Sequence, residues 1–461
     1  MLSLFGTPHD RGGFCDGRTR RDFLTAGGTL FGGCLALPHL LAAESKTAAK
    51  TGTKTSHKSV INIYLPGGPP HQDMWDLKPD APKEVRGEFN PIQTNVTGIQ
   101  ICELFPRIAK MMDKFAIIRS LVGSAGDHDA YQCMTGRPRT PANLGFWPSF
   151  GSWVSKSQGQ ADPAVPANVS LVYPCGEKRW GFHGDGGFLG IQHSPFHLVG
   201  GRDTGMKSDN LTLKGVSLDR LNDRVSLLNG FDDLSRKLDA KGTMDGMDSF
   251  NRQALDILTS SKLKDAIDLT KENPKVLERY GVDDPAFERD GAPRMVRNFC
   301  IARRLVEAGA RVVTMNFTRW DWHGPDGKNF VQARKDFPLL DVAITTLIQD
   351  IHDRGMSEDV SVIVWGEFGR TPKINNMASR DHWPQLSCAL LAGGGMKMGQ
   401  VIGSSNRLAE RAASRPVTHQ EIFATLYKNL GMDLNVVREY DANGRPHFPI
   451  DADAKPIREL V

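Results

Sequence analysis

Residues that can bind a metal ion or move a proton collect where the predicted strands of this 461-residue chain end. The stretch VIVWGEFGR (362–370) runs from an apolar strand into Glu367 and Arg370, and Asp381-His382 stands just before the next apolar run, LSCALL. Three other apolar runs are followed by carboxylates mixed with imidazoles. These are His71, Asp73 and Asp76 after SVINIYLPGG, Asp127, His128 and Asp129 after FAIIRSLVGSAG, and Asp321 and His323 after RVVTMNFTRW.

This arrangement predicts a divalent-metal site that holds one or two ions. In an open parallel sheet, ligands bind outside the carboxyl ends of the strands. Divalent cations take carboxylate oxygen and imidazole nitrogen, and two neighbouring cations need about six such ligands in total. One cluster alone would be interpreted as a solvated turn, but five clusters at strand ends favour a site. An arginine that grips the oxygens of an anionic ester would suit the same site, and Arg137 and Arg370 are the candidates.

The elements that would position these residues alternate between helix and strand. Segments 103–121, 295–317 and 337–369 each combine a helical apolar pattern with a following apolar strand, and Thr418 with Glu421 forms a capping-box pattern. Near-continuous apolar strands indicate a sheet covered on both faces. We therefore expect an α/β domain over 59–461 with a mostly parallel sheet, helices on both faces and a helical insertion over 216–290. Residues 174–215 form a long irregular stretch of the kind that often carries function. His193, His197 and Asn316 could also line the site.

The first 43 residues have the features of a twin-arginine export signal. Arg20-Arg21 precede Phe23-Leu24 and a glycine-rich apolar run, and small residues end the segment at Leu41-Ala42-Ala43. The apolar run is too short and too rich in glycine for a membrane span. We expect cleavage near Ala43, a flexible tether over 44–58, a periplasmic or otherwise exported mature protein with no stable membrane span, and the twin-arginine translocation machinery as a partner.

Composition excludes other classes of protein. The formal net charge of +4 comes from 57 basic and 53 acidic residues, so it gives no argument for nucleic-acid binding. The five cysteines beyond the signal have neither metal-finger spacing nor a disulfide framework, which predicts buried free thiols. They are Cys102, Cys133, Cys175, Cys300 and Cys388.

Three long segments carry a family resemblance. GGPPHQDMWDLKPDAPKEVRGEFNPIQTNVTGIQICELFPRIAK, WGEFGRTPKINN and RDHWPQLSCALLAGGGMKMGQVIG resemble the bacterial exported proteins grouped as domain-of-unknown-function family 1501. That family is similar in fold to the alkaline phosphatase and sulfatase superfamily, in which a parallel sheet carries two divalent metals at its strand ends. The resemblance implies an alkaline-phosphatase-like domain and one or two ions of zinc, calcium, magnesium or manganese. The implied ligands are Asp321, His323 and His382 for one ion and Asp73, Glu367 and His128 for the other, with Asp381 beside them.

The chain departs from the superfamily at the nucleophile. GDHDAYQCMTGRPR is similar to the sulfatase segment that ends in Thr-Gly-Arg, but the usual nucleophile position falls on Gly126, and Phe368 stands where a histidine is expected. One hypothesis is therefore a hydrolase of sulfate or phosphate esters, including sulfated or phosphorylated glycans, that uses a metal-bound hydroxide. Asp127 or His128 would then serve as general base, Arg370 would neutralise the ester and His183 would protonate the leaving group.

The alternative hypothesis is a non-catalytic relative that binds a metal or a glycan. It accounts for the missing nucleophile without new chemistry, and aromatic residues within 174–200 could stack on sugars. Metal content combined with turnover separates the two hypotheses.

Overall fold

The computed structural model describes residues 57–139, 147–199, 256–257, 260–324, 327–441 and 443–461, and the residues from His57 onward form one compact unit. The predicted signal over 1–43, the tether as far as residue 56, residues 200–215 of the irregular stretch and residues 216–255, 258 and 259 of the predicted insertion lie outside the described residues. Of the insertion, the described part contains the helices α9 (Lys262–Ile267) and α10 (Pro274–Tyr280) and the short strand β7 (Asp284–Phe287).

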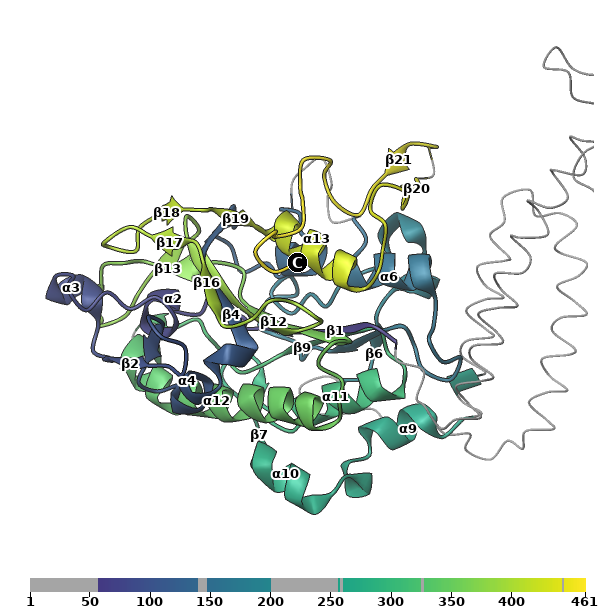
Figure 1. Ribbon diagram of the computed structural model, residues 1–461, viewed down its shortest axis with the longest axis horizontal. Coiled ribbons are helices and arrows are strands. Elements are labelled where there is room, and N and C mark those ends of the chain that lie inside the picture. Colours follow the sequence, from purple (N-terminus) through teal and green to yellow (C-terminus); the bar gives the residue numbers. More distant parts are fainter. Residues whose placement is uncertain (1–56, 140–146, 200–255, 258–259, 325–326, 442) are drawn as a thin grey trace, which may run out of the picture. The chain divides into compact units, whose positions relative to one another are not determined.

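A nine-stranded sheet forms the centre of the molecule (Figure 1). Every neighbouring pair in it is parallel except the two pairs made by β15, which runs antiparallel to β12 and β4. The expected mostly parallel sheet is therefore confirmed. In spatial order the strands are β16 (Gln400–Ile402), β4 (Phe115–Val122), β15 (Ser387–Gly393), β12 (Val360–Trp365), β1 (Ser59–Tyr64), β9 (Val312–Asn316), β5 (Asn168–Leu171) and β6 (Phe196–His197), with β19 (Val417–Thr418) also paired to β4.

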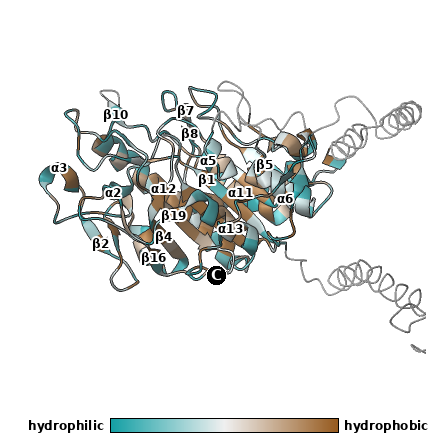
Figure 2. Ribbon diagram, turned by 90° about the horizontal axis from the view of Figure 1, so that it is seen from above, coloured by the Kyte–Doolittle hydropathy of each residue, from teal (hydrophilic) through white to brown (hydrophobic). Residues whose placement is uncertain are grey.

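Helices cover both faces of this sheet, as the sequence predicts (Figure 1). On one face lie α4 (Pro106–Lys110), α11 (Asn298–Ala308) and α12 (Asn329–Asp353), and on the other lie α6 (Phe150–Gln158) and α13 (His419–Asn429). Side chains alternate between the two faces of a strand, and the sheet has a hydrophobic core on each face. In β1, Ile61 and Ile63 pack into one core, and Val60 and Tyr64 pack into the other. Figure 2 shows the resulting hydrophobic colour on the strands and teal on the outer loops.

Local capping signals act as expected. Thr418 and Glu421 form the predicted capping box, with the Thr418 Oγ1 accepting from the Glu421 N–H at 3.3 Å. Gly309 ends α11 with a φ of 129°, a backbone conformation that favours glycine. The strand β9 can then start at Val312 on the neighbouring edge of β1.

Short elements complete the described residues. The helices are α2 (His71–Met74), α3 (Lys83–Arg86) and α5 (Tyr131–Thr135). The two-stranded pairs are β2 (Pro91–Gln93) with β3 (Gln100–Cys102), β7 with β8 (Pro293–Arg294), β10 (His323–Gly324) with β11 (Gly327–Lys328), β13 (Gly369–Arg370) with β14 (His382–Trp383), β17 (Ser404–Ser405) with β18 (Ala412–Ser414), and β20 (Glu439–Tyr440) with β21 (Pro446–His447). In the pair β13–β14, Arg370 stands opposite His382.

The thiols and the hydropathy of the helices also match expectation. All five cysteines in the described residues are buried thiols outside any disulfide, which confirms the prediction, and burial raises the pKa of Cys300 to about 11. Within the described ranges, we find no helix with the length and apolar character needed to cross a bilayer.

Candidate metal centre

Four side chains from three strand ends converge at one edge of the sheet, and we call His128, Asp321, His323 and His382 the metal cluster. His128 follows β4, Asp321 and His323 follow β9, and His382 precedes β15. Because β15 runs antiparallel, the residues before it lie at the same edge as those that follow β4 and β9. One ligand atom from each of the four residues lies within 4.8 Å of the other three.

The three imidazoles all direct Nε2 at the carboxylate of Asp321. Nε2 of His323 and of His382 lie 3.0 and 3.2 Å from Asp321 Oδ1, and Nε2 of His128 lies 3.4 Å from Oδ2. In a tetrahedral zinc site with bonds of about 2.0–2.1 Å, neighbouring ligand atoms are about 3.3 Å apart. The three nitrogen–oxygen distances are close to this spacing, and three imidazole nitrogens with one carboxylate oxygen are donors of the type that zinc binds.

The hydrogen bond at the far nitrogen of His382 assigns its tautomer. Nδ1 of His382 lies 3.0 Å from the carbonyl oxygen of Gly126, and a carbonyl only accepts, so Nδ1 carries the hydrogen. Nε2 contacts Asp321 in the metal-free protein, and it is the nitrogen that would offer a lone pair to an ion bound at the centre of the metal cluster. Such a backbone partner on the outer nitrogen is typical of histidine ligands.

His128 lies between two carboxylates. Burial alone would lower its pKa, but hydrogen bonds and charge from Asp321 and Glu367 raise the pKa to about 9. Burial would raise the pKa of Asp321, whereas its hydrogen bonds with the three histidines and the charge of Arg370 hold that pKa well below its ordinary value. In the metal-free protein, the cluster is therefore an ionised carboxylate beside a protonated imidazole.

Two buried arginines hold Asp321 from behind. Arg370 Nη2 donates to Asp321 Oδ1 at 2.7 Å, and Arg319 Nη2 donates to Oδ2 at 3.0 Å. The Arg370 side chain is 1% exposed, and its other bonds go to the carbonyl oxygens of Gly67, Gly68, Trp320 and Arg380. This position corrects the expectation that Arg370 grips an ester, because the buried guanidinium is directed at the protein.

Three expected ligands lie outside the metal cluster. Both carboxylate oxygens of Asp73 accept from Arg380, at 2.7 and 2.8 Å, in a pair that is almost fully buried. Asp381 is exposed and accepts from Asn375 at 2.9 Å. Glu367 is buried behind His128, with its Oε1 3.5 Å from His128 Nδ1. The structure thus brings together one set of four residues. Asp73, which the resemblance implies as a ligand of a second ion, is instead paired with Arg380.

The remaining candidates have varied surroundings. Asp127 is exposed beside His128, whereas His183 stacks on His197 with 4.4 Å between ring centroids. Burial lowers the pKa of His183, so its imidazole is neutral near pH 7 and is a weak proton donor. Arg137 pairs with Asp451 and covers the ring of Trp147 instead of joining the metal cluster.

Four further candidates contact other parts of the fold. They are Asn316 and His193, which were expected to line the site, and His71 and Asp76, which follow the first predicted strand. Asn316 binds the backbone N–H and carbonyl of Tyr173, at 2.8 and 2.9 Å, and fixes the segment after β5. His193 contacts Ser155, and burial lowers its pKa to about 4. His71 is fully buried, and Asp76 pairs with Lys78 at 2.9 Å.

Sequence reasoning missed Arg319 and Trp180. Arg319 stands two residues before Asp321 in TRWDWHG, a spacing that could have marked it as a partner of that carboxylate. Trp180 is buried and stacks on His128 with 4.4 Å between ring centroids. It comes from the irregular stretch expected to carry function, but no local pattern distinguishes it from the other aromatic residues there.

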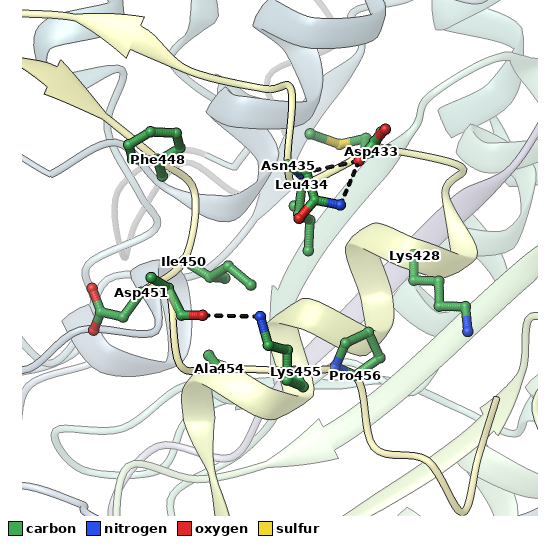
Figure 3. Close-up of a pocket in the computed structure, with 12 residues that line it drawn as sticks. Lys428, Asp433, Leu434, Asn435, Phe448, Ile450, Asp451, Ala454, Lys455 and Pro456 are labelled. Carbon is green, nitrogen blue, oxygen red and sulfur yellow. Dashed lines mark hydrogen bonds between the residues drawn. The ribbon is translucent and has the colours of Figure 1, made fainter.

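A separate pocket of about 470 Å³ lies beside the end of α13 (Figure 3). Leu434, Phe448 and Ile450 give it an apolar lining, and Lys455 donates to the Ala452 carbonyl at its edge. None of its lining residues belongs to the metal cluster. The two sites therefore have different chemistry.

Comparison with solved structures returns a phosphonate monoester hydrolase, a sulfatase and a periplasmic domain in complex with Zn, all at low similarity. The chain matches the phosphonate monoester hydrolase SpPMH from Silicibacter pomeroyi at 9% identity, covering 88% of this chain and 76% of that one, with a TM-score of 0.37. The PsFucS1 sulfatase from Pseudoalteromonas sp. matches at 11% identity over 85% and 71%, with a TM-score of 0.36. The C-terminal periplasmic domain of EcEptC from Escherichia coli, in complex with Zn, matches at 8% identity over 74% and 73%, with a TM-score of 0.34.

Sequence comparison assigns the family. No curated protein matches the chain. The model of a family described as "Protein of unknown function (DUF1501)" matches residues 57–461, which is most of the chain. The family expected from the three long segments is confirmed, and the chain belongs to the DUF1501 family.

Proposed function

We propose that the protein is an exported metal-dependent hydrolase of sulfate or phosphate esters that binds one divalent cation, preferably zinc, at the metal cluster. The convergence of His128, Asp321, His323 and His382 within 4.8 Å is the observation that carries this proposal. Three imidazoles favour zinc over the oxygen-preferring calcium and magnesium ions.

The charge of the cluster suits an anionic substrate. Asp321 supplies the single negative charge of the ligand set, and Arg319 and Arg370 already offset it. A divalent cation held by these four residues would therefore leave a net positive centre, which attracts sulfate or phosphate oxygens. His323 and His382 have side chains that are 41% and 27% exposed, so solvent and substrate reach this side of the cluster.

The bound ion and the residues around its ligands would have separate roles in hydrolysis. A bound divalent cation supplies Lewis-acid chemistry and lowers the pKa of water to about 7. Asp127, exposed and next to the ligand His128, is our candidate for the general base. Arg319 and Arg370 keep Asp321 ionised and oriented, which is a positioning role.

One observation favours the alternative of a non-catalytic metal- or glycan-binding protein. Gly126 offers no side-chain nucleophile although its carbonyl oxygen lies 3.0 Å from His382 Nδ1, beside the metal cluster. Hydrolysis must then use water as the nucleophile, whereas simple binding requires none.

Export rests on the sequence of the first 43 residues. Replacing Arg20-Arg21 by two lysines should leave the uncleaved chain in the cytoplasm, because the twin-arginine pair identifies this class of signal. Fractionation of cells that express either version tests this. Equal periplasmic amounts of the two versions would contradict twin-arginine export.

Turnover distinguishes the two functions. We expect the zinc-loaded mature protein to hydrolyse para-nitrophenyl sulfate or phosphate, with activity lost after chelation and in His382→Ala. The exposed His352, in the last turn of α12, provides the control variant His352→Ala, which should keep full activity. Stoichiometric zinc without hydrolysis of these and of sulfated or phosphorylated glycans would favour the binding protein.

A further inference from the structure

Two glycines after β1 form a tight elbow beside the metal cluster. Gly67 and Gly68 have φ values of +108° and +69°. A Cβ on Gly67 would lie 2.4 Å from the backbone nitrogen of Asp321, and one on Gly68 would lie 2.3 Å from the ring of Phe368. Only glycine fits both the backbone conformation and the space, so the elbow lies directly against the loop that carries Asp321.

Both the N–H groups and the carbonyl groups of the elbow form hydrogen bonds with side chains. The N–H groups of Gly67 and Gly68 donate to Oε1 and Oε2 of Glu367, at 2.8 and 3.2 Å. The Gly68 carbonyl accepts from Arg370 Nε at 2.8 Å, and the Gly67 carbonyl accepts from Arg370 Nη2. One dipeptide thus fixes both the carboxylate behind His128 and the guanidinium behind Asp321.

The fixed carboxylate determines which nitrogen of His128 would bind an ion. Glu367 is 1% exposed, and its Oε1 lies 3.5 Å from His128 Nδ1, at the long end of the hydrogen-bond range. On the other side of the ring, Asp321 Oδ2 lies 3.4 Å from Nε2, so in the metal-free protein both nitrogens face a carboxylate, which only accepts. An ion bound beside Asp321 would replace the hydrogen on Nε2, whereas Nδ1 would keep the hydrogen that it donates to Glu367. This is the arrangement in which a carboxylate orients a histidine ligand from behind.

We propose that Glu367 is a positioning residue that acts through His128, held by the Gly67-Gly68 elbow, and that it is not a ligand of the ion. This inference rests on the proposed metal site and replaces the expectation that Glu367 binds the ion directly.

A double-mutant cycle of zinc affinity tests the inference. In the wild-type background, Glu367→Gln should weaken zinc binding by about 10–100-fold, the range for loss of an orienting partner. A glutamine has one acceptor oxygen and no charge, so it would hold the Nδ1–H of His128 less strongly than the carboxylate does. In the His128→Ala background, Glu367→Gln should change zinc affinity less than about twofold, because its effect passes through His128. Competition with a chromogenic chelator measures all four affinities.

A matched control separates positioning from general stability. Asp341 also accepts two consecutive backbone N–H groups, those of Arg107 and Ile108 at 2.9 and 2.8 Å, and it is not part of the metal cluster. Asp341→Asn should therefore lower the melting temperature and leave zinc affinity unchanged. Nitrogen NMR of the zinc-loaded wild type should show His128 with hydrogen on Nδ1 and metal on Nε2.

The outcomes distinguish this inference from the proposed function. Wild type that binds zinc together with an equal loss for Glu367→Gln in both backgrounds would make Glu367 a ligand or a structural residue, and would overturn the inference alone. His128 with metal on Nδ1 would do the same. Wild type that binds no zinc would overturn the metal site and the inference with it.

Discussion

The metal cluster and a second group of charged side chains differ in how their charges are paired within the protein. The second group, which we call the arginine network, consists of Glu272, Arg303, Arg304, Glu307, Asp350 and Arg354. Arg303 is 1% exposed and contacts all three acids of this network, with Asp350 at 2.9 Å and Glu307 at 2.8 Å. Three guanidiniums thus face three carboxylates, and the charges balance within the protein.

The metal cluster lacks this balance. Asp321 already has two arginine partners, yet three imidazoles also direct Nε2 at it. Buried polar groups are retained where they are satisfied or where they have a function. The charges of the arginine network are already paired, whereas the three imidazole nitrogens that share Asp321 could also share a cation. This difference is the reason that we propose the metal cluster as the functional site.

Breaking the arginine network should give the largest loss of stability. Arg303→Met removes the most buried partner of Glu272 and Asp350, while Arg304 and Arg354 still contact these acids. Removing one member of a buried pair costs about 3–5 kcal/mol, and we expect a loss toward the lower end of that range. Urea denaturation measures the free energy of unfolding, and zinc binding should stay at the wild-type level. A loss below about 1 kcal/mol would mean that the network behaves like a surface ion pair.

Loss of His382 should weaken zinc binding and have little effect on stability, the reverse of the pattern expected for Arg303→Met. His382→Ala should weaken zinc binding by more than about 100-fold, beyond the range for an orienting partner, because Nε2 of His382 is itself lost. The metal-free melting temperature should change little, since the side chain is 27% exposed. Titration with zinc measures the affinity, and His352→Ala is the control. Unchanged zinc affinity in His382→Ala would remove His382 from the site.

A side chain at Gly67 of the elbow should both destabilise the fold and disturb the metal cluster. Gly67→Ala should cost about 1–3 kcal/mol and also weaken zinc binding, because the new methyl displaces Asp321. Gly123 has a similar φ of +84° and open space around it, so Gly123→Ala should cost only about 1–2 kcal/mol and leave zinc affinity unchanged. Thermal unfolding and zinc titration of both variants provide the comparison. Equal effects on zinc would contradict the link between the elbow and Asp321.

The last expected effect, which needs no substitution, is the pH dependence of zinc binding. The folded-state pKa of His128 is raised from 6.5 to about 9, so in the metal-free protein its contribution to stability is full below pH 6.5 and is lost as pH rises through about 9. Zinc must displace this proton, so its apparent affinity should rise about tenfold per pH unit between these values. Chelator competition at several pH values measures this slope. His128→Ala should lose that contribution, and an unchanged slope would contradict the assignment.

The sequence predicted the alternation of elements and the edge where the site lies, because apolar runs and the residues that follow them are local features. It did not predict that β15 runs antiparallel, since an apolar strand has the same pattern in either direction. It predicted all four members of the metal cluster but also included Asp73, Glu367 and Asp381, which lie outside it. For Asp73 the cause is physical: Arg380, which neutralises Asp73, is 307 positions away, and no local pattern indicates which cation a carboxylate will meet.

Elemental analysis of the mature protein, purified after its own export and supplied with zinc, tests the metal site most directly. We predict about one zinc ion per chain in wild type and in Asp341→Asn, and almost none in a folded His382→Ala variant. A well-folded wild type that takes up no metal, or an equal metal content in His382→Ala, would contradict the assignment of the metal cluster.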